Sequence, residues 1–271
     1  MGSDDVSSLL VTTLIAGIFG LFVGSFINVV VYRSPLGLSV SSPRSFCPSC
    51  KRQLTWWENI PVASWIALRG RCRTCHLSIS PRYPVVEVST GIIFGLVTWA
   101  WHGTLLSAAY CCLAAAMIAV SLVEYDGQRA PLSIAAIGTG VALVIIVVGG
   151  GWKHHWHIVI GSLIGTVIAA AAFAVLRTVD PECRDPRGRG RSALLIAGCW
   201  AGGLGLRPTV AGVAVWIVAY FVCMVGAWKL ARTRSASGAG PLPDPRVHPV
   251  LAVPLVSAVA AGMVASLVVW R

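Results

Sequence analysis

Long apolar blocks constrain this chain more than any other feature of its sequence. The protein is 56% hydrophobic and only 11% charged, whereas soluble domains carry about a quarter charged residues. A block of about 20 apolar residues can cross the hydrocarbon core of a bilayer as a helix, because a helix satisfies its own backbone hydrogen bonds. The sequence therefore predicts an all-α integral membrane protein.

About eight such blocks can be recognised. They lie approximately at residues 9–32, 84–101, 104–123, 132–149, 157–176, 192–206, 208–230 and 248–270. The first block lacks a basic start and a small-residue cleavage site, so we expect a retained helix rather than a signal peptide. The predicted organisation is a first transmembrane helix (1–32), a polar loop (33–83) and a transmembrane helical domain (84–271).

The positions of the basic residues predict the orientation of the helices. Four segments hold 18 of the 21 Lys and Arg residues, namely 33–83, 124–131, 177–191 and 229–247. Loops rich in Lys and Arg stay on the cytoplasmic side, so these segments are expected there and both chain ends outside. The net charge of +11 is then mainly a topology signal. Nucleic acid is not expected as a partner, because no folded basic domain is apparent.

Four cysteines in the 33–83 loop form two C-x-x-C pairs. Cys47 and Cys50 are followed after 21 residues by Cys72 and Cys75. Each pair can place two thiolates on one tight turn, and four thiolates close a tetrahedron around zinc. Two disulfides are the alternative, which a reducing cytoplasm disfavours. The spacing predicts a small zinc-ribbon-like module with these four ligands.

The same loop carries a resemblance to a known family. The sequence from Gly24 contains GSFINVVVYRSP, then PRSFCPSC, LTWWENIPVASWIALRGRCRTC and ISPRYPVVE. This pattern resembles the amino-terminal half of the type IV prepilin leader peptidases, from about Gly20 to Phe94. These are bacterial inner-membrane aspartic proteases, many of which also N-methylate the new amino terminus.

The resemblance implies a location, substrates and cofactors. It implies a multi-pass protein of the inner membrane that acts on type IV pilin-like or pseudopilin precursors by cleavage, N-methylation or both. Partners would be those precursors or components of a pilus or secretion system. S-adenosylmethionine would be needed if methylation is retained.

The resemblance also implies two catalytic aspartates, and this chain departs from both family patterns. Glu124 stands at the place of the first aspartate, and Asp126 follows two residues later. The family pattern G-x-G-D-x-K-L matches residues 188–194, where Arg191 stands in place of the second aspartate. The nearby acids that could replace it are Asp180, Glu182 and Asp185.

Two interpretations of these departures remain open. Either the register is displaced and an acid such as Asp185 supplies the second carboxylate, or the chain no longer cleaves. A catalytic pair of carboxylates shares one proton, and an arginine beside it would hold Glu124 or Asp126 ionised. The alternative function is therefore a catalytically inactive family member that serves as a membrane binding or assembly protein.

Polar and aromatic residues near the membrane allow two interpretations each. Asn28 and Glu87 lie inside predicted spans, where polar residues are either functional or bonded to a neighbouring helix. Trp56, Trp57 and Trp65 lie between the cysteine pairs. They either dock a partner or form the core of the ribbon with some interfacial anchoring, and we favour the core for Trp65.

Overall fold

The computed structural model describes residues 3–126, 128, 130–152 and 156–179. In these ranges the chain is mostly helical and contains no β-strand, only two isolated β-bridges. The predicted spans 192–206, 208–230 and 248–270 lie outside the described residues. So do Asp180, Glu182, Asp185 and Arg191.

Four described helices are long and apolar enough to cross a membrane, as the first four predicted blocks require. The helices are α1 (Ser3–Arg33), α3 (Arg82–Ala100), α4 (Leu105–Tyr125) and α5 (Leu132–Trp152). The fifth predicted block coincides with α6 (Trp156–Val179), which contains a shorter apolar stretch, Ile158–Ile168. The chain divides into two compact units, Met1–Ser107 and Ala108–Arg271.

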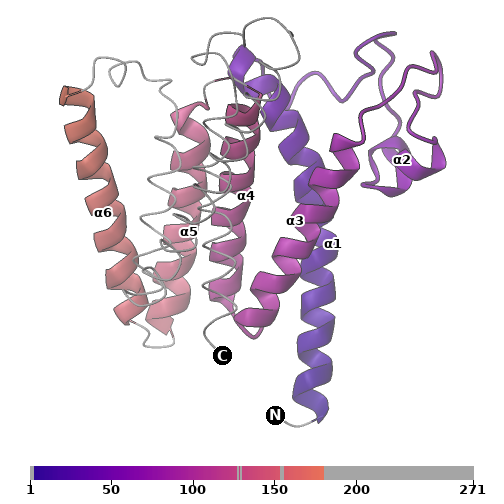
Figure 1. The fold of residues 1–271 in the computed structure, drawn as a ribbon. Helices are drawn as coiled ribbons and strands as arrows, with labels where there is room; N and C mark the ends of the chain where they lie inside the picture. The colour runs from indigo at the N-terminus through magenta and orange to yellow at the C-terminus, as the bar shows by residue number, and fades with distance from the viewer. Residues whose placement is uncertain (1–2, 127, 129, 153–155, 180–271) are drawn as a thin grey trace, which may run out of the picture. The chain divides into compact units, whose positions relative to one another are not determined.

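In the first unit, α1 and α3 pack against each other as an antiparallel pair (Figure 1). The contact is close because Gly20 and Gly24 of α1 face the backbone of α3. A Cβ at Gly24 would lie 2.7 Å from the Cα of Glu87, and one at Gly20 would lie 2.8 Å from the Cα of Gly91. Small residues four apart let two membrane helices approach in this way.

The polar loop between α1 and α3 carries short helical turns and tight hairpins. A 3-10 turn, η1 (Ser34–Leu36), ends α1, and Gly37 closes it in the left-handed conformation (φ 68°). Two further short helices follow between the cysteine pairs, η2 (Trp56–Asn59) and α2 (Ala63–Ala67). We refer to the segment from Ser45 to Ser80 as the ribbon.

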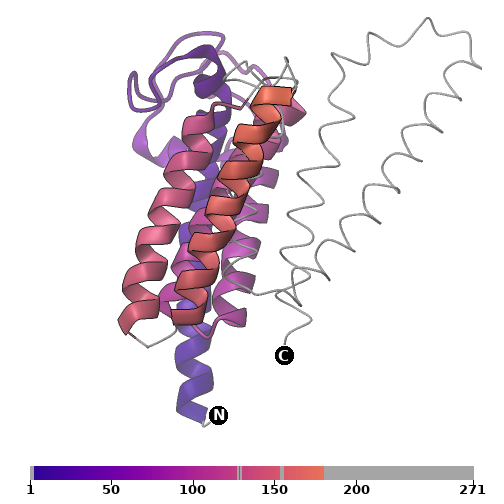
Figure 2. The ribbon, with the colours of Figure 1, turned by 90° about the vertical axis from the view of Figure 1, so that its left-hand side faces the viewer.

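In the second unit, α5 and α6 run side by side (Figure 2). Helices α4 and α5 also touch, since a Cβ added at Gly138 of α5 would collide with the Cβ of Ala116. Tyr110, Leu113, Met117 and Val120 of α4 are fully buried. This unit carries Glu124 and Asp126 at the end of α4.

Candidate metal centre

The two cysteine pairs lie on hairpin turns of the same construction. The Cys47 N–H donates to the Arg52 carbonyl (2.9 Å), and the Lys51 N–H donates back to the Cys47 carbonyl (2.9 Å). The second pair repeats this register, because the Cys72 N–H donates to the Leu77 carbonyl (2.8 Å). The His76 N–H likewise donates to the Cys72 carbonyl (3.0 Å). The ribbon is therefore a pseudo-repeat of two knuckles.

Each knuckle turns through a residue in the left-handed region. Lys51 has φ 59° and His76 has φ 55°, each four residues after the first cysteine of its pair. An isolated β-bridge closes each turn, Phe46 to Gln53 in the first and Arg71 to Ser78 in the second. These turns hold the two thiols of each pair toward one point.

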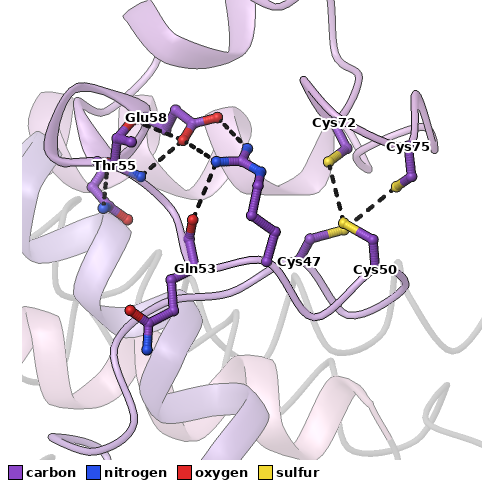
Figure 3. A network of polar contacts seen from close by, with 9 residues as sticks. Cys47, Cys50, Gln53, Thr55, Glu58, Cys72 and Cys75 are labelled. Carbon is purple, nitrogen blue, oxygen red and sulfur yellow. Dashed lines mark hydrogen bonds and ion pairs between the residues drawn. The ribbon is translucent and has the colours of Figure 1, made fainter.

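The four sulfur atoms converge at the geometry that a tetrahedral metal site requires. All four Sγ atoms lie within 4.8 Å of one another. The Cys47–Cys75 and Cys50–Cys72 Sγ distances are 3.8 and 4.0 Å (Figure 3). A tetrahedron with metal–sulfur bonds of about 2.3 Å has edges of about 3.8 Å, whereas a disulfide needs a sulfur–sulfur bond of about 2.05 Å. The cluster can thus hold one metal ion, and its four thiols are not paired as disulfides.

Backbone amides favour the thiolate form of two of these cysteines. The N–H groups of Cys75 and Thr74 lower the pKa of Cys72 to about 6, and a backbone hydrogen bond at Leu77 lowers the pKa of Cys75. At Cys50, a backbone hydrogen bond at Arg52 lowers the pKa, but burial and the neighbouring thiols raise it to about 11. A bound cation would ionise the remaining thiols, because metal binding displaces their protons.

An ion pair beside the first knuckle fixes the segment between the pairs. Glu58 of η2 binds the Arg52 guanidinium at two points (2.9 and 2.6 Å) and accepts the Thr55 N–H and hydroxyl at 2.8 Å each (Figure 3). Its side chain is only 1% exposed. The Arg52 partner lowers the pKa of Glu58 to about 2, with help from the Thr55 backbone amide. This carboxylate therefore holds η2 against Arg52 at the end of the first knuckle.

Trp65 forms part of the ribbon core, as the sequence predicted. Its Nε1 donates to the Ile79 carbonyl at 3.1 Å. Its ring lies against Gly70, which has φ 64°. A Cβ added at Gly70 would lie only 2.8 Å from the indole ring. Trp57 lies under the guanidinium of Arg73, 5.6 Å from the ring centroid. Trp56, in contrast, is 79% exposed.

Both polar residues singled out in the first spans bond across the fold. The Asn28 amide of α1 donates to the Tyr83 carbonyl at the start of α3 (3.3 Å). The buried Glu87 carboxylate of α3 accepts the Val62 N–H of the ribbon (2.7 Å). Both residues line a cavity of about 300 Å³ between α1, the ribbon and the start of α3. Asn28 therefore makes a helix-packing bond, and Glu87 joins the ribbon to the membrane helices.

The candidate catalytic acids lie at the end of α4. Glu124 belongs to the last turn of the helix, and Asp126 follows it as an exposed residue whose N–H donates to the Leu122 carbonyl (3.1 Å). The other implied acid, Asp185, lies outside the described residues. The Glu87–Val62 and Arg52–Glu58 ties were not predicted from the sequence.

Comparison with protein families gives a match to the amino-terminal half. Residues 18–101 match the family model described as Bacterial Peptidase A24 N-terminal domain. This range contains α1 from residue 18 onward, the four cysteines and α3.

Similarity to individual proteins extends further along the chain. A prepilin leader peptidase/N-methyltransferase of Pseudomonas putida is 32% identical over 211 residues, which cover 69% of this chain and 72% of that protein. An Escherichia coli type 4 prepilin-like proteins leader peptide-processing enzyme is 32% identical over 225 residues, or 74% and 81% of the two chains.

A third relative is more similar over a shorter stretch. The Myxococcus xanthus prepilin leader peptidase/N-methyltransferase is 44% identical over 130 residues, 46% of this chain and 38% of that protein. No solved structure matches the chain significantly.

Proposed function

This chain belongs to the prepilin leader peptidase/N-methyltransferase family, and we propose that it acts on the leader peptides of type IV pilin-like or pseudopilin precursors at the bacterial inner membrane. The observation that carries the proposal is the extent of the similarity, which covers more than two thirds of both this chain and the P. putida relative. The four apolar helices of the described part agree with a multi-pass membrane protein. Pilin-like precursors are accordingly the proposed substrates, and the proposed reaction is cleavage of the leader, N-methylation of the new amino terminus, or both.

We further propose that the four-cysteine cluster binds one zinc ion and that the ribbon lies in the cytoplasm. The thiolate ligand set and the sulfur–sulfur distances fit a closed, structural zinc site, in which no coordination position is left for a substrate. The eight basic residues of segment 33–83 support the cytoplasmic side. Bound zinc would hold the two knuckles together, and the chemistry at the leader would fall to other residues.

Glu124 and Asp126 are the proposed catalytic acids, with Asp185 as a candidate second carboxylate. A pair of carboxylates with one shared proton can activate water against a peptide bond, one member as base and the other as acid. S-adenosylmethionine would supply the methyl group for N-methylation of the new amino terminus.

A second candidate function is a binding or assembly protein that no longer cleaves. Arg191 favours it, because this arginine stands where the family pattern has its second aspartate. Such a protein would still hold pilin-like precursors, or components of a pilus or secretion system, in the membrane.

Co-expression with a type IV prepilin tests both candidates in one experiment. Loss of the leader in the mass of the recovered precursor supports the peptidase, and gain of a methyl group supports the methyltransferase. An unchanged precursor that co-purifies with the chain supports the binding protein. An unchanged precursor that does not co-purify contradicts the proposed substrate class.

A further inference from the structure

The short helices η2 and α2 present large apolar side chains away from the ribbon core. Trp56 is 79% exposed and Ile66 is 65% exposed, and Ile60 between the two helices is also exposed. We call these three residues the interfacial face. Helices η2 and α2 contact each other, so the three residues belong to one short helical hairpin. Trp65, by contrast, points into the ribbon, where its Nε1 is bonded to Ile79.

One hydrogen bond fixes the position of this hairpin along the axis of α3. The Val62 N–H, immediately before α2, donates to Glu87 at 2.7 Å. Glu87 is five residues into α3, which begins at Arg82. At 1.5 Å per residue this is about 7.5 Å along the helix. Figure 1 accordingly shows α2 beside the first turns of α3 rather than beyond its end.

Helix α3 is only just long enough to cross the hydrocarbon core, so its first turns must lie at or within the bilayer. Its 19 residues span about 28 Å, close to the thickness of a hydrocarbon core of about 30 Å. Arg82 and Tyr83 at its start are residue types that anchor helices at the membrane–water interface. The start of α2, held about 7.5 Å further along α3, therefore lies just below the level at which α3 enters the bilayer, at the depth to which interfacial helices bury their apolar face.

The charge of the surrounding loop matches an anionic lipid surface. Segment 33–83 contains eight Lys and Arg residues and one acid, Glu58, which is buried against Arg52. Arg69 and Arg71 come within four residues of the end of α2 and are exposed. Interfacial segments combine an apolar face with flanking basic residues in this way, because the first enters the acyl region and the second binds headgroup phosphates.

We propose that η2 and α2 form an interfacial anchor that lies in the headgroup region of the leaflet where α3 begins. Trp56, Ile60 and Ile66 contact the acyl chains, and Arg69 and Arg71 bind anionic headgroups. The ribbon is then held on the membrane surface at two places, through Glu87 and through lipid. This double attachment fixes the position of the four-cysteine cluster relative to the bilayer.

The test uses the full chain in lipid nanodiscs of phosphatidylcholine, with and without phosphatidylglycerol. An environment-sensitive fluorescent amino acid replaces Trp56 or Ile66, and in a matched control it replaces Ser49, an exposed residue of the first knuckle. Positions 56 and 66 are exposed and lie outside the four-cysteine cluster, so they tolerate substitution without loss of the fold. The metal content of the position 49 protein verifies that its knuckle is retained. The proposal expects lipids brominated near the carbonyl end of their chains to quench positions 56 and 66 but not 49. Iodide in the buffer should quench position 49 the most.

A charge variant separates the two parts of the proposal. In the Arg69→Gln/Arg71→Gln variant, the gain in quenching that phosphatidylglycerol gives should disappear. Quenching of positions 56 and 66 by iodide, with none by brominated lipid, would overturn the anchor. So would shielding that develops only after a pilin-type precursor is added, since the face would then be a protein interface. Neither outcome depends on whether the chain cleaves that precursor.

Discussion

Glu87 places a carboxylate in the second turn of a membrane helix, where it accepts a backbone N–H from the ribbon at 2.7 Å. The donor, Val62, has φ 61° and ψ −52°. These angles form a tight turn that is rare and strained for a β-branched residue. Such a conformation persists when its surroundings determine it. The Glu87 carboxylate is the part of those surroundings that comes from the membrane helices.

Replacing Glu87 by Leu should loosen the ribbon, whereas Glu87→Gln should preserve it. Leucine leaves the Val62 N–H without an acceptor, at a cost of about 1–3 kcal/mol, but the glutamine carbonyl can still accept that bond. Hydrogen–deuterium exchange over residues 60–68 in nanodiscs measures the difference. Equal exchange in wild type and Glu87→Leu would contradict the assigned tie.

The Arg52–Glu58 pair predicts a loss of ribbon stability in acid. The pKa of Glu58 is about 2 in the fold, against 4.5 for the free group. A carboxyl whose pKa is depressed by folding contributes stability above its unfolded pKa, and this contribution is lost as the pH falls through the folded pKa. Wild type should therefore lose stability relative to Glu58→Gln between about pH 4.5 and pH 2.

Thermal unfolding of both proteins across this pH range gives the measurement. The cysteines also take up protons in acid, but they do so in both proteins, so the difference isolates Glu58. A constant difference in melting temperature from pH 5 to pH 2 would show that the pair does not depress this pKa.

The sequence revealed which residues of this region were unusual but not what they contact. Asn28 and Glu87 stood out as polar residues in apolar spans, and a helix-packing bond was one of the two interpretations given for Asn28. Val62 precedes Glu87 by 25 residues and contributes only its backbone N–H. No side-chain pattern encodes that partner, so it became visible only in three dimensions.

At the scale of elements, the contact between α1 and α3 depends on glycine. A methyl group at Gly24 would meet the Cα of Glu87 at 2.7 Å and the carbonyl oxygen of Val86 at 3.0 Å. Both are backbone atoms, which cannot move aside without shifting a helix. Gly95 of α3 differs, because a methyl group there would find Thr13 at 3.8 Å, an ordinary contact distance.

Gly24→Ala should consequently destabilise the helix pair by about 1–3 kcal/mol, the range for an overpacked interface. Gly95→Ala is the matched control and should be neutral or slightly stabilising, since alanine favours a helix over glycine. Unfolding of the full chain in detergent compares the two. Equal stability of both variants would mean that α1 and α3 do not approach as closely as described.

The ribbon predicts one zinc ion per chain, with all four cysteines as ligands. Purified protein should contain about one equivalent of zinc, and Cys47→Ser or Cys72→Ser should abolish it, since a structural site needs its full tetrahedron. Cys112→Ser, in α4 outside the cluster, is the matched control and should retain the metal. Elemental analysis of the three variants decides, and full zinc in Cys47→Ser would refute the assignment.

The spacing of the cysteines was enough to predict that the four thiols would meet. The two-knuckle construction was less visible, because its register depends on backbone bonds around Lys51 and His76. These residues adopt left-handed angles (φ 59° and 55°) without being glycine. Apolar length likewise predicted the first four spans, but the spacing of α1 from α3 depends on individual glycines rather than on hydrophobicity.

On the scale of the whole molecule, the family match and the implied catalytic acids lie in different parts of the chain. The amino-terminal half matches its family model from residue 18 to 101 and contains the cysteine cluster. The catalytic acids implied by the family fall after it, at Glu124 and beyond residue 179. Family membership therefore predicts the substrate class, whereas cleavage depends on a few positions at which this chain departs from the family pattern.

The last prediction concerns those positions, and we expect wild type to cleave a type IV prepilin weakly or not at all. Arg191 stands where the second aspartate is expected and Glu124 where the first is expected. A positioned acid or base contributes about 10²–10⁴-fold in rate, so loss of one partner leaves little turnover. A positive charge nearby also opposes the half-protonated state of a carboxylate pair.

Restoring both aspartates in the Glu124→Asp/Arg191→Asp variant should increase cleavage, read as the mass of a co-expressed precursor. The P. putida relative is the positive control for that precursor. Efficient cleavage by wild type that Glu124→Ala or Asp126→Ala abolishes would instead show a displaced register. Asp185→Asn would then identify the second carboxylate, because it should abolish the same activity.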